Sequence, residues 1–498
     1  MDLKKLLWDN PILVKHARSR LRRRDLFPSI VAVVIVAGCI VWGASATNNI
    51  KNGVGFVALL AFQSALLFLV GTSSVASSIA HARDSGMMDF HRISPQPPLS
   101  TALGFLLGGP IREWLLFACT IPFSLFFVTK GSPPMKSWLL IFITTLTTTL
   151  LYHCVAATAG MLVAKPRNVG AMVIVSLWFL YCAALAGLKV AFLTLIPVAC
   201  HGVLPRSSLW LDYVHRGLPT FYRSRWDPFW LSLLHQVPLI VFLFIACVRK
   251  MRHGGVLAYS KPLAVVFHVV LAFLIAGDLW GMRLDPGTAH VVGTYLLTTA
   301  ALLLTLAITP KAGQFATGVR RARKAGLLNQ PPWSDLSSNW VAVLAFAALV
   351  EIGSALCGGG TEGKMTETTI TSVLVGACTV VYFGAARQCF ELRFARSSGP
   401  YFLLFLFFVW IVPTLIGAIM APWDLQWSKV VGAISPLAGI GFASDPDMPS
   451  AVAWVAIASS ILLTLVFLIW QIGLERHATE AALLPPGQVT PSASSGVA

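Results

Sequence analysis

The chain has 498 residues, of which 56% are hydrophobic and only 11% are charged, a balance that excludes a soluble fold. Its formal net charge of +17 does not indicate nucleic-acid binding, because the basic residues follow the pattern of a membrane protein. With both termini placed in the cytoplasm, 26 of the 37 Lys and Arg residues fall in inner segments. The basic excess therefore orients the chain and contacts anionic membrane lipid.

Apolar runs long enough to cross a bilayer recur along the chain. A helix of about 20 residues spans the hydrocarbon core and satisfies its backbone polar groups internally. We therefore predict an all-α, polytopic integral membrane protein of about 12 transmembrane helices, located in the inner (cell) membrane with both termini in the cytoplasm. The predicted spans are 28–46, 54–80, 104–128, 137–163, 169–188, 229–247, 262–281, 289–308, 338–357, 370–386, 401–420 and 451–472.

The spans form two groups of six that share a short motif. A shift of 234 residues places Gln96-Pro97-Pro98 on Gln330-Pro331-Pro332 and carries flanking spans with it. Because six is even, both halves would have the same orientation, which predicts a parallel repeat. The halves are predicted at 28–248 and 262–475, with a cytoplasmic linker at 249–261.

Residues 1–27 are predicted to form a basic helix at the cytoplasmic membrane surface. Asn10 and Pro11 fit an N-cap and a first helical position. The basic residues that follow include Lys15, Arg18 and Arg22, and an apolar stripe accompanies them (Ile12, Leu13, Ala17 and Leu21). An amphipathic helix on the inner leaflet is the expected result.

Two further predictions concern the two ends of the chain. A cleavable signal peptide, suggested by Ala44-Ser45-Ala46, is the alternative to a retained first span, but the long polar region before the apolar run disfavours it. The cytoplasmic tail, 476–498, contains Pro, Ser, Ala and Gly and is predicted to be disordered.

Sequence motifs for nucleotide binding, metal binding and cysteine chemistry are weak or absent. Gly358 to Thr366 matches a phosphate-binding loop except that Met365 replaces the hydroxyl residue that holds Mg²⁺. On the predicted topology this segment also lies on the outer side of the membrane, where no ATP is available. In the outer loop 189–228, Asp212 and His215 offer only two ligands, so no metal site is predicted. The nine cysteines contain no C-x-x-C pair.

Few ionisable residues fall at membrane depth, and such residues are costly and hence functional candidates. They are Arg112, Glu113, Asp278 and Glu351. Arg112 and Glu113 follow a Gly-rich segment that a re-entrant or tilted chain would place at the membrane edge. The alternative to a functional role is that these carboxylates lie at the interface and pair with Arg.

Two local motifs resemble the permease subunits of ABC transporters of the exporter (type-2) class. The stretch from Asn10 to Arg22 resembles that family's interfacial helix, with His16 where a Glu is usual. The segment from Ala82 to Ser100 resembles the family's region after the second span, although Ser85 and Met87 replace an expected Glu and Thr. The resemblance implies that this chain carries no ATPase domain and binds no cofactor itself.

The same resemblance implies that a separate cytoplasmic ABC ATPase docks on the loop after the second span and holds ATP and Mg²⁺. The permease pathway would be formed by this chain alone, by a homodimer or with a second permease subunit. The expected coupling loops are 81–100 and 309–337. The candidate coupling residues are Arg83, Asp84, Asp89, His91, Arg92, Arg320, Arg321, Arg323 and Lys324.

Two other functions compete with this expectation. A secondary transporter of six-plus-six topology would need a coupling-ion site at mid-depth, for which the sequence offers few residues. A membrane-embedded enzyme would have to use His153, His235 or His268, which lie in separate spans without acidic companions. For these histidines, helix packing or hydrogen bonding between helices is the simpler interpretation.

Overall fold

The computed structural model describes residues 9–47, 50, 53–94, 96–130, 133–162, 169–185, 192–203, 220–252, 254–255, 257–281, 286–357, 367–395, 397–442 and 450–483. Its contacts divide the chain into two units. Unit 1 is Met1–Thr220 with Arg225–Val256, and unit 2 is Phe221–Ser224 with Leu257–Ala498. The main boundary between the units, between Val256 and Leu257, falls inside the predicted linker 249–261.

The described residues contain 11 helices that are long and apolar enough to cross a membrane. This confirms an all-α, multi-pass membrane protein. The predicted number of 12 stays a prediction, because the described apolar part of the span predicted at 169–188, Val169–Cys182, is shorter than the other spans. Residues 186–188 of that span lie outside the described part, and the duplication stays a prediction.

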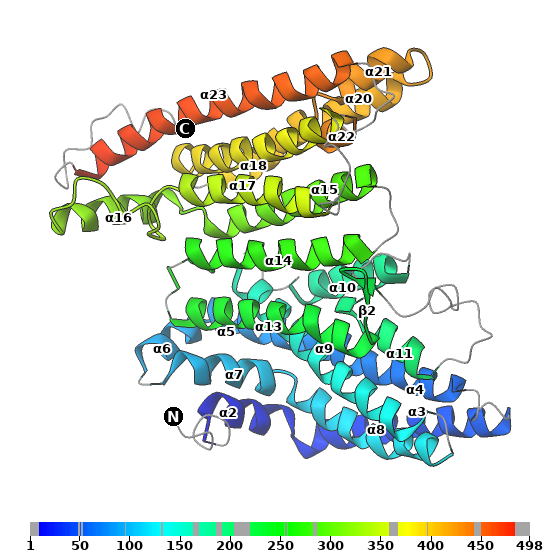
Figure 1. Cartoon of the computed structure of the whole chain (residues 1–498). Coiled ribbons are helices and arrows are strands. Elements are labelled where there is room, and N and C mark those ends of the chain that lie inside the picture. The colour runs from blue at the N-terminus through cyan, green and yellow to red at the C-terminus, as the bar shows by residue number, and fades with distance from the viewer. Residues whose placement is uncertain are drawn as a thin grey trace. The chain divides into compact units, whose positions relative to one another are not determined.

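Unit 1 is a helical bundle (Figure 1). In chain order its elements are α2 (Pro11–Arg20), α3 (Arg23–Ala46), α4 (Val54–Ser64), the π-helix η1 (Ala65–Gly71), α5 (Thr72–Asp84), α6 (Met87–Ile93), α7 (Pro98–Gly108), α8 (Ile111–Thr129), α9 (Met135–Leu162), α10 (Val169–Leu185), α11 (Ile196–Val203) and α13 (Pro228–Arg252). Helix α9 is central and packs against both α5 and α13. The approach to α5 is close, because a Cβ atom at Gly160 would lie 2.7 Å from the carbonyl oxygen of Ala76.

Unit 2 is also helical and has its own central helix. Its elements are α14 (Lys261–Gly281), α15 (Pro286–Ile308), α16 (Ala312–Lys324), α17 (Trp340–Cys357), α18 (Glu367–Arg393), α19 (Ser398–Leu406), the π-helix η4 (Phe407–Ile411), α20 (Val412–Met420), α21 (Leu425–Gly432), α22 (Pro436–Phe442) and α23 (Ser450–Leu483). Helix α18 packs against α15, α17 and α23. A two-stranded hairpin, β1 (Thr220–Phe221) and β2 (Ser224–Arg225), precedes α13 in the chain.

The predicted span 104–128 is wrong at its start. The structure has a separate 11-residue helix, α7, and the long helix α8 begins only at Ile111. Gly109 and Pro110 lie between them; Pro110 has no N–H to donate, and its own backbone is not helical (φ -96°, ψ 25°). An 11-residue helix is too short to cross the hydrocarbon core.

The predicted terminal segments also need correction. Helix α2 ends at Arg20 and α3 starts at Arg23, so Arg22 lies between them rather than within the interfacial helix. The tail predicted to be disordered from 476 is helical as far as Leu483. The reason is packing, because Ala478 and Ala482 lie against Phe315 of α16. Residues 484–498 lie outside the described part.

Candidate functional site

The loop 81–100 contains a short helix, α6, between α5 and α7. Gly86, with φ of 73°, ends the turn after α5 in the left-handed conformation that glycine tolerates. Met88 points inward and is buried, whereas Phe90 is 63% exposed and Ile93 is 83% exposed. Helix α6 therefore presents two large, mostly exposed apolar side chains.

Helix α2 packs against α7. The Asn10 side chain caps α2 by accepting from the backbone N–H groups of Ile12 (3.1 Å) and Leu13 (3.3 Å). Its amide also donates to the carbonyl oxygen of Ser100 at 2.7 Å. A Cβ atom at Gly104 would lie 2.8 Å from Cβ of Ile12, so the two helices meet at a residue without a side chain. Asn10 is thus both a cap and a link between helices.

Two histidines pack against Phe105 of α7. His16 of α2 lies 5.6 Å from that ring and His91 of α6 lies 6.2 Å from it, both edge-on. Burial, followed by the positive charges of Arg20, Lys15 and His91, lowers the pKa of His16 to about 4. Burial and Lys15 also lower the pKa of His91. Both rings are therefore neutral at pH 7, and an apolar ring joins α2, α6 and α7.

Three arginines predicted to contact an ATPase bind helix ends within the chain. Arg83 donates to the carbonyl oxygen of Gly160 in the last turn of α9 at 3.1 Å and pairs with Asp84 at 3.0 Å. Arg92 pairs with Asp89. Its Nε and Nη2 donate to the carbonyl oxygens of Met251 and Lys250, each at 3.3 Å, in the last turn of α13.

The third arginine lies in unit 2. Arg320 of α16 donates from Nε to the carbonyl oxygen of Ala482, near the end of α23, at 3.1 Å. Its neighbours Arg321, Arg323 and Lys324 are exposed. The apolar face of α16, formed by Phe315, Val319 and Ala322, is buried.

The motif Gln330-Pro331-Pro332 has a different structure from its counterpart. In unit 1 Pro98 begins α7, whereas in unit 2 the motif lies in the turns that precede α17. Gln330 donates to the carbonyl oxygen of Phe315 at 3.3 Å, and a Cβ atom at Gly318 would lie 2.3 Å from Oε1 of Gln330. The turn is therefore folded back on α16.

A fully buried lysine, which the sequence did not single out, holds this turn. Nζ of Lys261 lies within hydrogen-bond distance of the carbonyl oxygens of Ser334 (2.7 Å), Ser337 (2.8 Å) and Ser338 (2.6 Å) and of Oγ of Ser337 (2.6 Å), which share its three N–H donors. The carbonyl oxygen of Pro332 lies 3.4 Å away. Ser338 and Gln471 in turn donate to the carboxylate of Glu475 on α23. The end of loop 309–337 is thereby fixed to α14 and α23.

The four polar residues expected at membrane depth have different surroundings. Glu113 is fully buried; its Oε1 accepts from Ser74 and from Arg112, each at 3.3 Å, and its Oε2 has no hydrogen-bond partner. Asp278 is also buried. Glu351 is exposed on α17. The pairing of Glu113 with Arg112 is the arrangement expected for an interfacial carboxylate.

The histidines considered for an enzyme remain in separate helices. His153 packs edge-on to Trp114 at 5.8 Å, Nδ1 of His235 lies 2.8 Å from the carbonyl oxygen of Leu231, and Nε2 of His268 lies 3.2 Å from that of Leu297. Within the described ranges, no three His, Cys, Asp or Glu residues are placed to hold a metal ion. Asp212, His215 and Gly358 to Thr366 lie outside those ranges.

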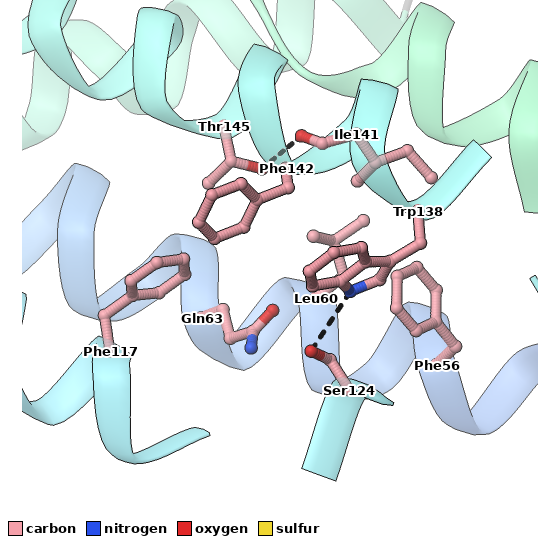
Figure 2. Close-up of a pocket in the computed structure, with 9 residues that line it drawn as sticks. All are labelled: Phe56, Leu60, Gln63, Phe117, Ser124, Trp138, Ile141, Phe142 and Thr145. Atoms are coloured by element: carbon pink, nitrogen blue, oxygen red, sulfur yellow. Dashed lines mark hydrogen bonds between the residues drawn. The ribbon is translucent and has the colours of Figure 1, made fainter. Parts of the chain in front are cut away.

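A small pocket in unit 1 lies between α4, α8 and α9 (Figure 2). Its walls include Phe56, Phe117, Phe142 and Trp138, and Nε1 of Trp138 donates to Oγ of Ser124 at 3.2 Å. Its cavity volume of ≈ 10 Å³ is about enough for one water molecule. The pocket therefore identifies no substrate.

Comparison of the chain with known proteins finds no matching family model, no matching curated protein and no matching solved structure. The functional assignment must therefore rest on the residues and contacts described above.

Proposed function

We propose that the chain is the permease subunit of an ATP-driven exporter of the type-2 ABC class, in the inner membrane with both termini in the cytoplasm. A separate cytoplasmic ATPase would supply the energy and would hold ATP and Mg²⁺. The observation that carries the proposal is the arrangement of α2, α6 and α7. A short helix follows the second long apolar segment, presents Phe90 and Ile93, and is joined by Phe105 to an N-terminal helix that begins with Asn10-Pro11.

The exposed pair on α6 suits docking to a protein. Phe90 and Ile93 are next to the charged residues Asp89 and Arg92. Large apolar side chains surrounded by charge are typical of the centre of a protein interface. On the proposed topology this surface faces the cytoplasm, where lipid does not cover it. The basic cluster Arg18, Arg22, Arg23 and Arg24, exposed beside α3, would contact anionic lipid at the same membrane surface.

The proposal is tested by capture of the ATPase. The full-length, tagged chain is purified in mild detergent, and ATP hydrolysis in the purified sample is measured. We expect bound hydrolytic activity, and we expect the double substitution Phe90→Ser with Ile93→Ser to lower it by about tenfold, as for the loss of two interface anchors. The matched control is Leu327→Ser with Leu328→Ser, an exposed apolar pair in unit 2. A wild-type chain without ATP hydrolysis, or equal activity in both double variants, contradicts the proposal.

One observation favours an ion-coupled transporter as a second candidate. Glu113 is a fully buried carboxylate with one oxygen lacking a hydrogen-bond partner, which is a feature of proton-binding sites in membranes. In that case transport in proteoliposomes would follow an imposed proton gradient without ATP, and Glu113→Gln would abolish it. Under the type-2 proposal, transport requires ATP and the bound ATPase whatever the proton gradient.

A further inference from the structure

Two arginine side chains of the loop 81–100 bind the ends of membrane helices in unit 1: Arg83, in the last turn of α5, and Arg92, on α6. The acceptors are the carbonyl oxygens of Gly160 in α9 and of Lys250 and Met251 in α13. These carbonyls lie in the last turn of each helix, where no intrahelical N–H is available to them. A guanidinium group there both satisfies the acceptors and interacts favourably with the negative end of the helix dipole.

Each of the two arginines, whose contacts with helix ends are the joints of this loop, also pairs with a nearby aspartate. Asp84 pairs with Arg83 and Asp89 pairs with Arg92, so each guanidinium is oriented from its own segment. Next to the second joint, a Cβ atom at Gly254 would lie 2.4 Å from Nη1 of Arg92, so glycine leaves the space that the guanidinium occupies. Lys250 also donates from Nζ to the carbonyl oxygen of Gly254 at 2.9 Å, which closes the chain around Arg92.

We propose that Arg83 and Arg92 are positioning residues that transmit displacement of α6 to the ends of α9 and α13. Helix α9 packs against both α5 and α13, so the two joints act on neighbouring helices of one bundle. A force applied to α6 at Phe90 or Ile93 acts on α13 directly through Arg92. It acts on α9 through the turn 85–86, the end of α5 and Arg83. The role in transport rests on the proposed function, whereas the joints themselves are properties of the chain alone.

The joints are tested first without any ATPase. Full-length protein in lipid nanodiscs is analysed by amide hydrogen exchange, and Arg92→Gln is compared with Arg252→Gln, an exposed arginine in the same last turn of α13. We expect Arg92→Gln to raise exchange in the last turn of α13 by about five- to tenfold, as for the loss of a charge-assisted hydrogen bond. Arg252→Gln should leave exchange unchanged. Arg83→Gln should have the same effect at the end of α9.

Transmission is tested in the complex with the ATPase that co-purifies with the wild-type chain. Spin labels are placed on genetically encoded side chains, because the chain has nine cysteines. One label replaces Ile93 or Arg252, and the reference label replaces the exposed Lys130 at the far end of α8. Distances are measured before and after addition of ATP with vanadate. In the wild type we expect both distances to change; with Arg92→Gln, only the distance from Ile93 should change.

The outcomes decide separately on the joint, on transmission through it and on the proposed function. Exchange that is equal in Arg92→Gln and the wild type overturns the joint. Movement of position 252 that persists in Arg92→Gln overturns transmission, as does equal loss of movement at both labels. Arg92→Lys keeps the charge but not the fork of N–H donors, so we expect this folded variant not to restore movement of position 252. A wild-type chain that captures no ATPase refutes the proposed function and transmission together, while the exchange result still decides the joints.

Discussion

The loops 81–100 and 309–337 occupy corresponding places in the predicted repeat, yet they are held in different ways. In loop 81–100 the joints are arginines paired with exposed aspartates, and the Asp89 side chain is 75% exposed. In loop 309–337 the joint is Lys261, which is fully buried among backbone carbonyl oxygens. Exposed ion pairs are weak and exchange with water, whereas a buried, fully bonded ammonium is costly to release. The first loop is therefore easier to displace than the second.

The residues that align between the two loops are not the residues that make equivalent contacts. Arg92 and Arg320 are not aligned by the 234-residue shift, yet each binds a carbonyl in the last turn of its unit's final long helix. The aligned Gln-Pro-Pro motifs, by contrast, begin a helix in unit 1 and form turns in unit 2. Under the proposed function, we therefore expect loop 81–100 to transmit movement and loop 309–337 to stay fixed.

The largest expected effect is the loss of the buried lysine. Lys261→Met leaves several carbonyl oxygens without their donor, and we expect a destabilisation of about 3 kcal/mol, as for other broken buried polar clusters. The readout is thermal unfolding in detergent, with amide exchange of residues 330–339. The control is Lys324→Met at an exposed position of α16, which should change little. A Lys261→Met protein as stable as this control would show that the second loop is not fixed in this way.

A smaller effect is expected where α2 meets α7. Gly104→Ala places a Cβ atom 2.8 Å from Cβ of Ile12 and 2.9 Å from Oδ1 of Asn10, so overpacking should cost about 2 kcal/mol. Exchange of the α2 amides reports detachment of that helix. Gly313→Ala in α16 is the matched control, since its Cβ atom meets no atom within 4 Å and alanine favours helix. Intact protection of α2 in Gly104→Ala would argue against its docking on α7.

The smallest effect concerns pH. Because the pKa of His16 is lowered from 6.5 to about 4, the unfolded state binds the proton more tightly than the folded state. The packing of α2 is fully present above pH 6.5 and weakens as the pH falls from 6.5 towards 4. We expect a loss of about 1 kcal/mol between pH 7 and pH 5, allowing for solvent screening of a partly exposed ring. His16→Gln should remove this part of the pH dependence of unfolding; an unchanged slope would refute the assignment.

Local signals in the sequence predicted local structure well. Asn10 and Pro11 begin α2 as expected, because an N-cap and a proline at the first position act within one turn. The break at Gly109-Pro110 was missed as a helix boundary, since the mean hydropathy of a long window hides one proline. The partners of Arg92 lie 158 and 159 residues away, and those of Lys261 lie 71–77 residues away. Such contacts depend on tertiary packing and leave no periodic pattern to read.

The most direct test of the central claim is photo-crosslinking from single positions in the full-length protein in native membranes. A photoreactive side chain replaces Ile93, which is 83% exposed on α6, or Leu328, which is 89% exposed after α16. We predict that position 93 crosslinks to a protein with Walker motifs and that position 328 gives at most a weak product. Crosslinking to such an ATPase from position 328 alone, or from neither position, would contradict the account.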